Sequence, residues 1–245
     1  MDYKSGPENR LVTMGGIMPK EQSRPIVLTI PGLWNSGPDH WQTAWERERP
    51  DCHRVELGCW DDPIRNVWIS RIDQAVHDAR GDVVLVAHSL GCHAVAWWAR
   101  LLGPSGISRV KGALLVAPPD ADRADIDPRI ARFSPTPAVI LPFPTLLVAS
   151  RGDAYASIDR ARTMAELWGA FLVDVGDLGH INAASGLGNW PQGQELLSIL
   201  AGDARSDCTR VVLAERVAAL TRDSVTVPGR DRQGDQHLPA GQGAR

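Results

Sequence analysis

The stretch Val83-Val84-Leu85-Val86-Ala87-His88-Ser89-Leu90-Gly91-Cys92-His93-Ala94 decides the fold. A short apolar run is followed by Ala-x-Ser-x-Gly and then by a segment with the pattern of a helix. This order places Ser89 on the sharp turn between a buried strand and a helix, where the serine backbone is strained. Small residues two positions before and after the serine, here Ala87 and Gly91, avoid collisions with the neighbouring strand and helix. The pattern is that of a nucleophile elbow with alanine in place of its first glycine.

Apolar runs of strand length recur along the chain and alternate with segments of helical pattern. Their hydrophobicity is continuous, which indicates strands buried on both faces and therefore a parallel sheet covered by helices. The expected strands are Ile26–Ile30, His53–Leu57, Val83–Val86, Gly112–Val116, Thr145–Ala149 and Phe171–Val175. The expected helices are Asp39–Glu48, Ile64–Ala79, Leu90–Leu102, Ile158–Trp168 and Gln192–Leu200. This alternation predicts an α/β fold with right-handed crossovers.

The chain has 245 residues, enough for one α/β domain with its own core. We expect that domain at residues 25–205, after a polar lead at 1–24 that we expect to be flexible. Residues 118–137, rich in Asp, Arg and Pro, predict a surface excursion with one helical turn. Residues 206–222 have the pattern of one more amphipathic helix, and the polar residues 223–245 have the composition of a disordered tail.

Composition excludes several classes of function. The formal net charge of −3 and the lack of a Lys/Arg cluster argue against a nucleic-acid partner. No apolar run approaches the roughly 20 residues that span a bilayer, and no signal-peptide pattern is present. The four cysteines form no C-x-x-C pair or zinc pattern, so we expect free thiols and neither metal nor cofactor. We expect a cytoplasmic protein with a small-molecule substrate and no membrane partner. The sequence does not indicate an oligomeric state.

A serine hydroxyl near neutral pH needs a base, and the base needs an orienting acid. In the α/β-hydrolase layout these partners follow the serine in the order acid, then histidine, on loops after later strands. Asp153 follows the expected strand Thr145–Ala149, and His180 follows Phe171–Val175. Both partners stand where the layout requires them, so Ser89, Asp153 and His180 are the expected catalytic residues.

Other carboxylates and histidines compete for these roles. Asp174 lies inside a strand, and Asp177 shares the histidine's own loop, so both rank behind Asp153. His88 adjoins Ser89 on a tight turn, so we expect its side chain to point away from the serine and to be a packed or supporting group. His93, one turn along the helix that follows the serine, is expected to be structural too. The remaining histidines fall on helices, on strands or in the tail, away from the shared loop: His40, His53, His77 and His237.

An acyl-transfer site also needs donors for the developing oxyanion. One is expected to be the backbone N–H of Leu90, the residue after the nucleophile. The second is expected from the loop after the first strand, where Gly32 permits close approach; we expect the N–H of Leu33, with that of Trp34 as second choice.

Nine tryptophans serve two expected purposes. Packing is expected for those on helical segments, namely Trp41, Trp45, Trp68, Trp97, Trp98 and Trp168. Trp34, Trp60 and Trp190 fall in loops near the catalytic ends of strands. They either form the walls of an apolar substrate pocket or cover the sheet edge, and the sequence does not separate the two interpretations.

Several segments together resemble a known group. These are Ile30-Pro31-Gly32, Trp60-Asp61-Asp62-Pro63, Ala87-His88-Ser89-Leu90-Gly91, Ala117-Pro118-Pro119, Ser150-Arg151-Gly152-Asp153-Ala154-Tyr155 and Gly179-His180-Ile181-Asn182-Ala183. Between about Pro25 and about Leu200 the chain resembles the compact serine hydrolases of the α/β-hydrolase superfamily related to retinoblastoma-binding protein 9, including YdeN-like bacterial esterases. The long polar lead and the residues after about Arg205 depart from that pattern.

The resemblance implies a trimmed α/β-hydrolase fold without a large lid, with six strands in the order 2-1-3-4-5-6. It also places the acid and the base at Asp153 and His180. The expected activity is cleavage of small carboxylic esters through an acyl-enzyme, without a cofactor. The alternatives are an amidase, aminopeptidase-like or thioesterase activity, and a non-catalytic protein-binding module on the same fold, because a fold does not fix a function.

Overall fold

A computed structural model describes residues 24–103 and 107–202, together with residues 215 and 218. The expected lead at 1–24 therefore lies almost entirely outside the described residues, and the tail at 223–245 lies entirely outside them. Of the helix expected at 206–222, only Glu215 and Ala218 are described, and both have helical backbone. No helix of the described part is long and apolar enough to cross a membrane.

Within the described residues, six strands form one parallel sheet in the order β2-β1-β3-β4-β5-β6. This confirms the expected strand order. The strands are β1 (Ile26–Ile30), β2 (Cys52–Arg54), β3 (Val83–His88), β4 (Val110–Val116), β5 (Thr145–Ala149) and β6 (Phe171–Asp174). The chain reverses direction across the sheet between β1 and β3. In doubly wound sheets the crevice opens at this switch point, at the carboxyl ends of the strands.

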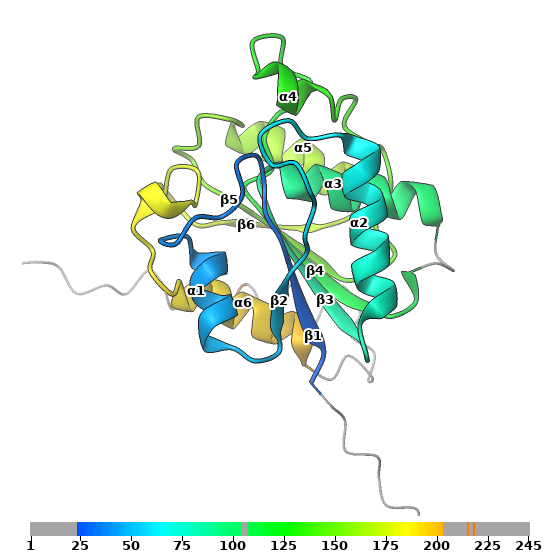
Figure 1. Cartoon of the computed structure of the whole chain (residues 1–245). Coiled ribbons are helices and arrows are strands. Elements are labelled where there is room, and N and C mark those ends of the chain that lie inside the picture. Colours follow the sequence, from blue (N-terminus) through cyan, green and yellow to red (C-terminus); the bar gives the residue numbers. More distant parts are fainter. Residues whose placement is uncertain (1–23, 104–106, 203–214, 216–217, 219–245) are drawn as a thin grey trace, which may run out of the picture.

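Helices cover both faces of the sheet (Figure 1). They are α1 (Trp41–Glu48), α2 (Arg65–Asp78), α3 (Leu90–Leu102), α4 (Pro128–Ala131), α5 (Ile158–Trp168) and α6 (Pro191–Ala201), with a 3-10 turn η2 at Ala183–Ser185. α1 and α6 lie together on one face, and α2, α3 and α5 lie on the other. The short α4 lies in the excursion after β4, as the composition of residues 118–137 predicts.

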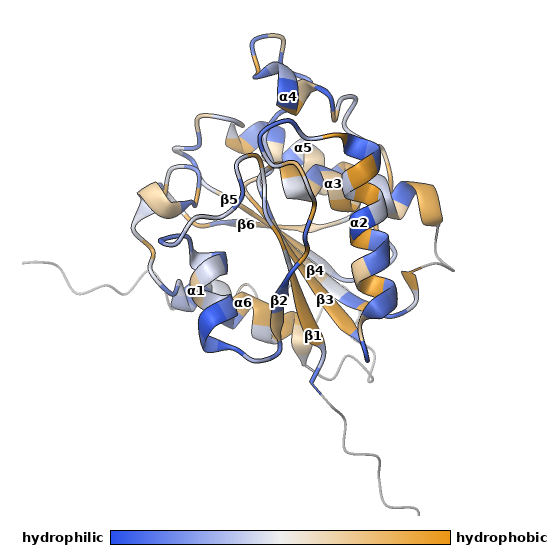
Figure 2. Ribbon diagram, in the orientation of Figure 1, coloured by the Kyte–Doolittle hydropathy of each residue, from blue (hydrophilic) through white to orange (hydrophobic). Residues whose placement is uncertain are grey.

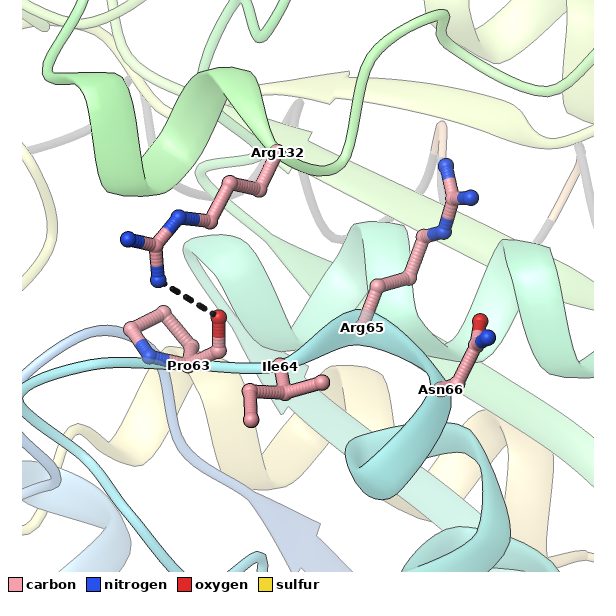
Figure 3. A pocket seen from close by; sticks show the side chains of 5 residues that line it. All are labelled: Pro63, Ile64, Arg65, Asn66 and Arg132. Carbon is pink, nitrogen blue, oxygen red and sulfur yellow. Dashed lines mark hydrogen bonds between the residues drawn. The ribbon is translucent and has the colours of Figure 1, made fainter.

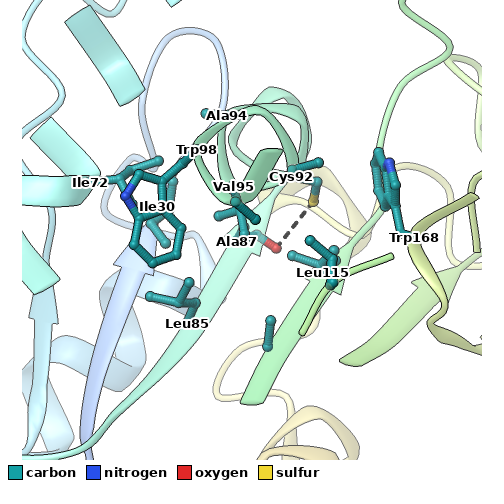
Figure 4. Close-up of a cluster of buried hydrophobic side chains, with 14 of the residues drawn as sticks. Ile30, Ile72, Leu85, Ala87, Cys92, Ala94, Val95, Trp98, Leu115 and Trp168 are labelled. Atoms are coloured by element: carbon teal, nitrogen blue, oxygen red, sulfur yellow. Dashed lines mark hydrogen bonds between the residues drawn. The ribbon is translucent and has the colours of Figure 1, made fainter. Parts of the chain in front are cut away.

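Each face of the sheet has its own apolar core. One core joins β3 to the helices α2, α3 and α5, and Figure 4 shows Leu85, Val95 and Trp98 within it. The other joins Val84 and Val86 of the same strand to α1 and α6. Hydropathy follows this arrangement: the strands are apolar, whereas α2 alternates between apolar and polar residues around its axis (Figure 2).

The tryptophans expected to pack do so. Trp41, Trp45, Trp68, Trp98 and Trp168 are each at most 1% exposed, which confirms their structural role. Trp97 is half-buried and donates its indole N–H to the carbonyl of Phe133 (2.8 Å).

The second strand differs from expectation. β2 covers Cys52–Arg54, not His53–Leu57, because it is an edge strand that pairs only with β1. The N–H of Val55 still donates to the carbonyl of Thr29, but β1 ends one residue later and leaves no further partner. Val55 and Leu57 bury their side chains in the core although neither residue belongs to β2. Burial alone therefore produced their strand-like pattern.

Candidate active site

The Ser89 backbone has the strained geometry of a nucleophile elbow. The residue lies between β3 and α3 with φ 54° and ψ −126°, outside the conformations that non-glycine residues favour. Its N–H donates to the carbonyl of Val116 at the end of β4 (2.8 Å), which fixes the turn to the sheet. The serine as a whole is 8% exposed, so it is nearly buried in the folded chain.

Two glycines allow the loop after β1 to approach this turn closely. A Cβ on Gly91 would lie 2.7 Å from the carbonyl oxygen of Pro31. A Cβ on Gly32 would lie 2.7 Å from the Cβ of Ser89 and 3.1 Å from the backbone nitrogen of Leu90. Real Cβ atoms essentially never approach other atoms below 3.0 Å, so both positions require glycine. The loop after β1 therefore lies directly against the serine.

His180 lies on the loop after β6, between two residues with left-handed backbone. Gly179 has φ 57° and Ile181 has φ 48°. The imidazole Nε2 of His180 is 2.9 Å from the hydroxyl oxygen of Ser89, a hydrogen-bonding distance. The structure thus brings together a serine and a histidine that are 91 positions apart in the sequence.

Asp153 completes the cluster from the turn after β5. Both of its carboxylate oxygens lie 2.9 Å from Nδ1 of His180, and its side chain is only 4% exposed. One of these oxygens also accepts a hydrogen bond from the backbone N–H of Tyr155 (2.8 Å). The ring of Tyr155 packs against the imidazole, with centroids 4.4 Å apart. The carboxylate is therefore held in place independently of the histidine.

The loops that carry the acid and the histidine are joined to each other. The N–H of Arg151 donates to the carbonyl of Gly176 (2.7 Å), and the N–H of Leu178 donates to the hydroxyl oxygen of Ser150 (2.8 Å). Ser185 in η2 donates its hydroxyl to the carbonyl of Leu178 (2.6 Å) and closes the loop around the histidine. These bonds fix the separation of the two loops.

The competing carboxylates face elsewhere. Asp174 pairs with Arg151 at the surface (2.8 Å). Its slight burial raises its pKa, but the hydrogen bond from the N–H of Gly176 and the ion pair with Arg151 outweigh this effect and lower the pKa below its ordinary value. Asp177 is exposed and lies against Gly152, where a Cβ would collide with its carboxylate. Neither carboxylate contacts the histidine that bonds to the serine.

Two backbone N–H groups next to the serine have no acceptor among the described residues. They belong to Leu33, in the loop after β1, and to Leu90, the first residue of α3. The second-choice donor, Trp34, is engaged, since its N–H donates to the carbonyl of Trp60 (3.0 Å). Of the two expected alternatives in this loop, Leu33 therefore retains a free donor and Trp34 does not.

Two buried imidazoles lie in a row next to His180, the histidine that bonds to the serine. His88, next to Ser89 in the chain, donates from Nε2 to the carbonyl of His180 (3.0 Å). His40 lies against His88 with ring centroids 4.7 Å apart, so the expectation that His40 lies away from the site is wrong. The α1 helix brings it there, because His40 is the N-cap of α1 and accepts the N–H of Gln42 at Nδ1 (3.2 Å).

Burial keeps these imidazoles uncharged. It lowers the pKa of His40 to about 4, and the positive charge of Arg54 contributes. Burial likewise holds the pKa of His88 well below the ordinary value. His93 in α3 is buried too, has a lowered pKa for the same reason, and lies 2.7 Å from the carbonyl of Pro119, as expected of a structural histidine. His53 and His77 are exposed on β2 and α2.

The three loop tryptophans differ in position. Trp34 is 55% exposed beside Leu33, and the guanidinium of Arg129 lies 4.6 Å from its ring centroid. Trp60 is half-buried against Trp68, with ring centroids 5.9 Å apart. Trp190 is 2% exposed and packs on α1, against Trp41 and Trp45. This corrects the pocket interpretation for Trp190, because a side chain that solvent does not reach cannot line an open pocket.

A cavity of about 340 Å³ lies apart from the serine (Figure 3). It is lined by Pro63, Ile64, Arg65, Asn66 and Arg132, and Arg132 donates to the carbonyl of Pro63 across it. It contains none of the expected catalytic residues.

Within the described ranges, no group of three or more His, Cys, Asp or Glu side chains gathers in a way that could hold a metal ion.

Comparison with known proteins shows the family to which the chain belongs. A family model described as serine hydrolase matches residues 27–199. The chain belongs to the serine hydrolase family. A protein from Pectobacterium atrosepticum described as a YdeN-like hydrolase is 32% identical, with a TM-score of 0.61; the match covers 80% of this chain and 92% of that one. No curated protein is similar enough in sequence to count as a match.

More distant structures share the fold of this serine hydrolase. The ydeN gene product of B. subtilis is 19% identical with a TM-score of 0.57, covering 72% of this chain and 98% of that one. The type II thioesterase BorB of the borrelidin biosynthetic cluster is 15% identical with a TM-score of 0.52, covering 76% of this chain and 94% of that one. Both have the α/β-hydrolase architecture, as the resemblance in sequence implies. The chain is a hydrolase of the α/β-hydrolase superfamily.

Proposed function

We propose that this serine hydrolase cleaves small carboxylic esters through a covalent acyl-enzyme. The observation that carries the proposal is the position of the His180 imidazole, with Nε2 2.9 Å from the Ser89 hydroxyl and Nδ1 2.9 Å from both oxygens of Asp153. In a Ser-His-Asp triad this arrangement lets the imidazole accept the serine proton while the carboxylate fixes its tautomer and stabilises the imidazolium. A binding module on the same fold has no physical need for it.

The chemistry proceeds in two halves. The Ser89 oxygen attacks the ester carbonyl carbon, and its proton moves to Nε2 of His180. The tetrahedral intermediate then collapses, the bond to the alkoxy oxygen breaks, and His180 returns the proton to the departing alcohol. In the second half water attacks the acyl-serine with the same histidine as base, which releases the carboxylic acid and restores the hydroxyl.

The free N–H groups of Leu33 and Leu90 are the proposed oxyanion hole. Their availability supports this role, and the close packing of Gly32 on Ser89 places the two backbone segments beside each other. Donors that already point at the site of developing charge need no reorganisation during the reaction. Removal of one such donor typically costs about 3–4 kcal/mol of transition-state stabilisation.

Trp34 and Trp60 are the proposed walls of the substrate site. The exposed indole of Trp34 directly follows the proposed donor Leu33, and its backbone bond to Trp60 joins the two loops. Apolar and aromatic side chains of this kind bind the hydrocarbon part of an acyl or alkoxy group. The same attack on the carbonyl would open a thioester or an amide, and comparison of the three bond types with one common acyl group measures the preference.

The proposed function is tested by hydrolysis of p-nitrophenyl acetate. Ser89→Ala is expected to lower kcat by a factor on the order of 10⁶, as loss of a triad nucleophile does in subtilisin. Ser70→Ala is the matched control, because Ser70 is exposed on the outer face of α2. It is expected to leave kcat unchanged. A Ser89→Ala enzyme as fast as the control would refute the proposal.

A further inference from the structure

The backbone next to His180 is strained at Ile181. Gly179 before it and Ile181 after it both have left-handed backbone, and in Ile181 this occurs at a β-branched residue. Such a conformation is a genuine outlier for isoleucine and persists only where the surroundings enforce it. Ile181 is fully buried, so its side chain is fixed as well. What holds this turn also determines where the imidazole points.

Two ring N–H donors hold the strained turn. Nε2 of His88 lies 3.0 Å from the carbonyl oxygen of His180, and Nε1 of Trp41 lies 2.8 Å from the next carbonyl oxygen, that of Ile181. Because a carbonyl oxygen only accepts hydrogen bonds, His88 must carry its proton on Nε2. Successive carbonyl groups on either side of the strained residue are therefore each bound by a side chain from another part of the fold.

The two donors are themselves buried among other aromatic rings. His88 is 5% exposed and Trp41 is 1% exposed. The ring of His40 packs against both, with centroids 4.7 Å from that of His88 and 5.2 Å from that of Trp41. Trp190 also packs against Trp41, with ring centroids 4.9 Å apart. Because these rings are packed on several sides, their N–H groups stay in place for the carbonyl groups of the loop.

One of these donors is also the chain neighbour of the nucleophile. His88 is the last residue of β3, and Ser89 follows it with a backbone that is fixed to β4. The hydrogen bond from His88 thus joins the nucleophile turn directly to the backbone of the base. This bond touches neither the Ser89 hydroxyl nor the imidazole nitrogen that faces it.

We propose that His88 and Trp41 are positioning residues that hold the strained His180-Ile181 turn so that the imidazole stays aligned with Ser89. This inference rests on the proposed function, because alignment matters only if His180 acts on Ser89. Misplacement of a catalytic group by about 1 Å can cost about 10²-fold in rate. Loss of either donor is therefore expected to slow the chemical step and to leave substrate binding nearly unchanged.

The first test compares His88→Leu with His88→Gln on p-nitrophenyl acetate. Leucine fills the space without a donor, whereas the glutamine amide can donate from near the position of Nε2. We expect kcat to fall about 10- to 100-fold in His88→Leu with KM within about two-fold, and to recover most of that loss in His88→Gln. Equal kcat in wild type and His88→Leu would overturn the inference.

His93→Leu is the matched control for general damage to the core. His93 is also a buried imidazole bonded to a backbone carbonyl, but its partner is Pro119 and not the His180 loop. Both variants are expected to lower the melting temperature, and only His88→Leu is expected to lower kcat. Equal losses of kcat in the two variants would reduce His88 to a packing residue and contradict the proposal.

Trp41→Phe provides a second variant, which decides the matter if His88→Leu does not fold. Phenylalanine keeps an aromatic ring in the core but removes the N–H that binds the carbonyl of Ile181. We expect a loss of kcat in the same range, and an unchanged kcat would contradict the role of Trp41.

A double variant tests whether His88 acts through His180. In a His180→Ala background, His88→Leu should have no further effect on the residual rate, whereas an undiminished further loss would show that His88 does not act through His180.

Failure of this inference is distinguishable from failure of the proposed function. Every assay includes Ser89→Ala. If Ser89→Ala keeps its turnover, the proposed function has failed and the inference falls with it. If Ser89→Ala is inactive while His88→Leu and Trp41→Phe are both as fast as wild type, the serine acts as proposed and the positioning role alone is wrong.

Discussion

Both carboxylate oxygens of Asp153 lie 2.9 Å from Nδ1 of His180. This contact fixes the proton of a neutral imidazole on Nδ1 and leaves Nε2 as the acceptor that faces the Ser89 hydroxyl. The side chain of Asp153 is 4% exposed, and the N–H of Tyr155 binds one of its oxygens. The acid therefore selects the tautomer that the proposed reaction needs.

Asp153→Asn is expected to keep the geometry and lose the activity. An amide in this position can donate to Nδ1 and favours the wrong tautomer, so we expect kcat to fall by about 10⁴-fold, as in the corresponding change in a Ser-His-Asp protease. The measurement is kcat on p-nitrophenyl acetate. Asp177→Asn, in the histidine's own loop but exposed to solvent, is the matched control and is expected to be as active as wild type. The reverse order of activities would show that the acid is misassigned.

Gly32→Ala is expected to damage the site from the backbone side. Its Cβ would lie 2.7 Å from the Cβ of Ser89, so the loop that carries Leu33 must move away from the nucleophile. Overpacking of this kind typically costs about 1–3 kcal/mol of stability. We expect a lower melting temperature together with a lower kcat. Gly81→Ala, where a Cβ would meet no heavy atom within 4 Å, should change neither, and equal behaviour of the two variants would contradict the close approach.

Acid pH is expected to destabilise the fold through the buried imidazoles. His40 has a pKa of about 4 in the folded chain and 6.5 as its ordinary value, so between these values the unfolded chain binds a proton that the folded chain does not. The free energy of unfolding therefore falls as the pH falls from about 6.5 to 4. With this shift in pKa, His40 alone is expected to contribute about 3 kcal/mol to the loss at pH 4.

His40→Asn isolates this contribution. Asparagine does not titrate, and it is a good N-cap, so it preserves the capping of α1. Denaturant unfolding at pH 7.5 and pH 4.5 should show a smaller loss of stability in the variant than in wild type. Part of the pH dependence of the unfolding free energy should remain in the variant, because burial also lowers the pKa of His88 and of His93. An unchanged pH dependence of the unfolding free energy in His40→Asn would show that His40 is not the titrating group.

Cysteine reactivity is expected to follow burial. Burial raises the pKa of Cys52 to about 12 and that of Cys92 above its ordinary value, so neither forms the reactive thiolate at pH 8. Cys59 is exposed. Iodoacetamide followed by peptide mass mapping of the folded protein should find Cys59 modified well before Cys52 and Cys92. Rapid modification of Cys92 would contradict its burial beneath the nucleophile turn.

The parts of the site that follow from local chemistry were predictable from the sequence. Ser89, Asp153 and His180 each follow an apolar run, and the carboxyl ends of parallel strands meet at one edge of a sheet. The structure brings these three side chains within hydrogen-bonding distance. The strand order also agrees with the order that the resemblance in sequence implies.

What the sequence did not predict depends on packing between distant segments. Trp190 and Trp34 are both aromatic loop residues, yet one is buried against α1 and the other is exposed. Periodicity contains no information about that difference. His40 lies in front of a helix far from the motif, and only the docking of α1 brings it against His88. The Val55–Leu57 segment likewise appears strand-like because it is buried, although its partner strand ends too early.

The most direct test of the account is the mass of the intact protein after reaction with a fluorophosphonate, followed by peptide mapping. The account predicts a single phosphonyl adduct on the peptide that contains Ser89 in the wild-type protein, and no adduct in a folded Ser89→Ala variant. A folded wild-type protein that gains no mass, or a Ser89→Ala variant labelled as fast as wild type, would contradict it.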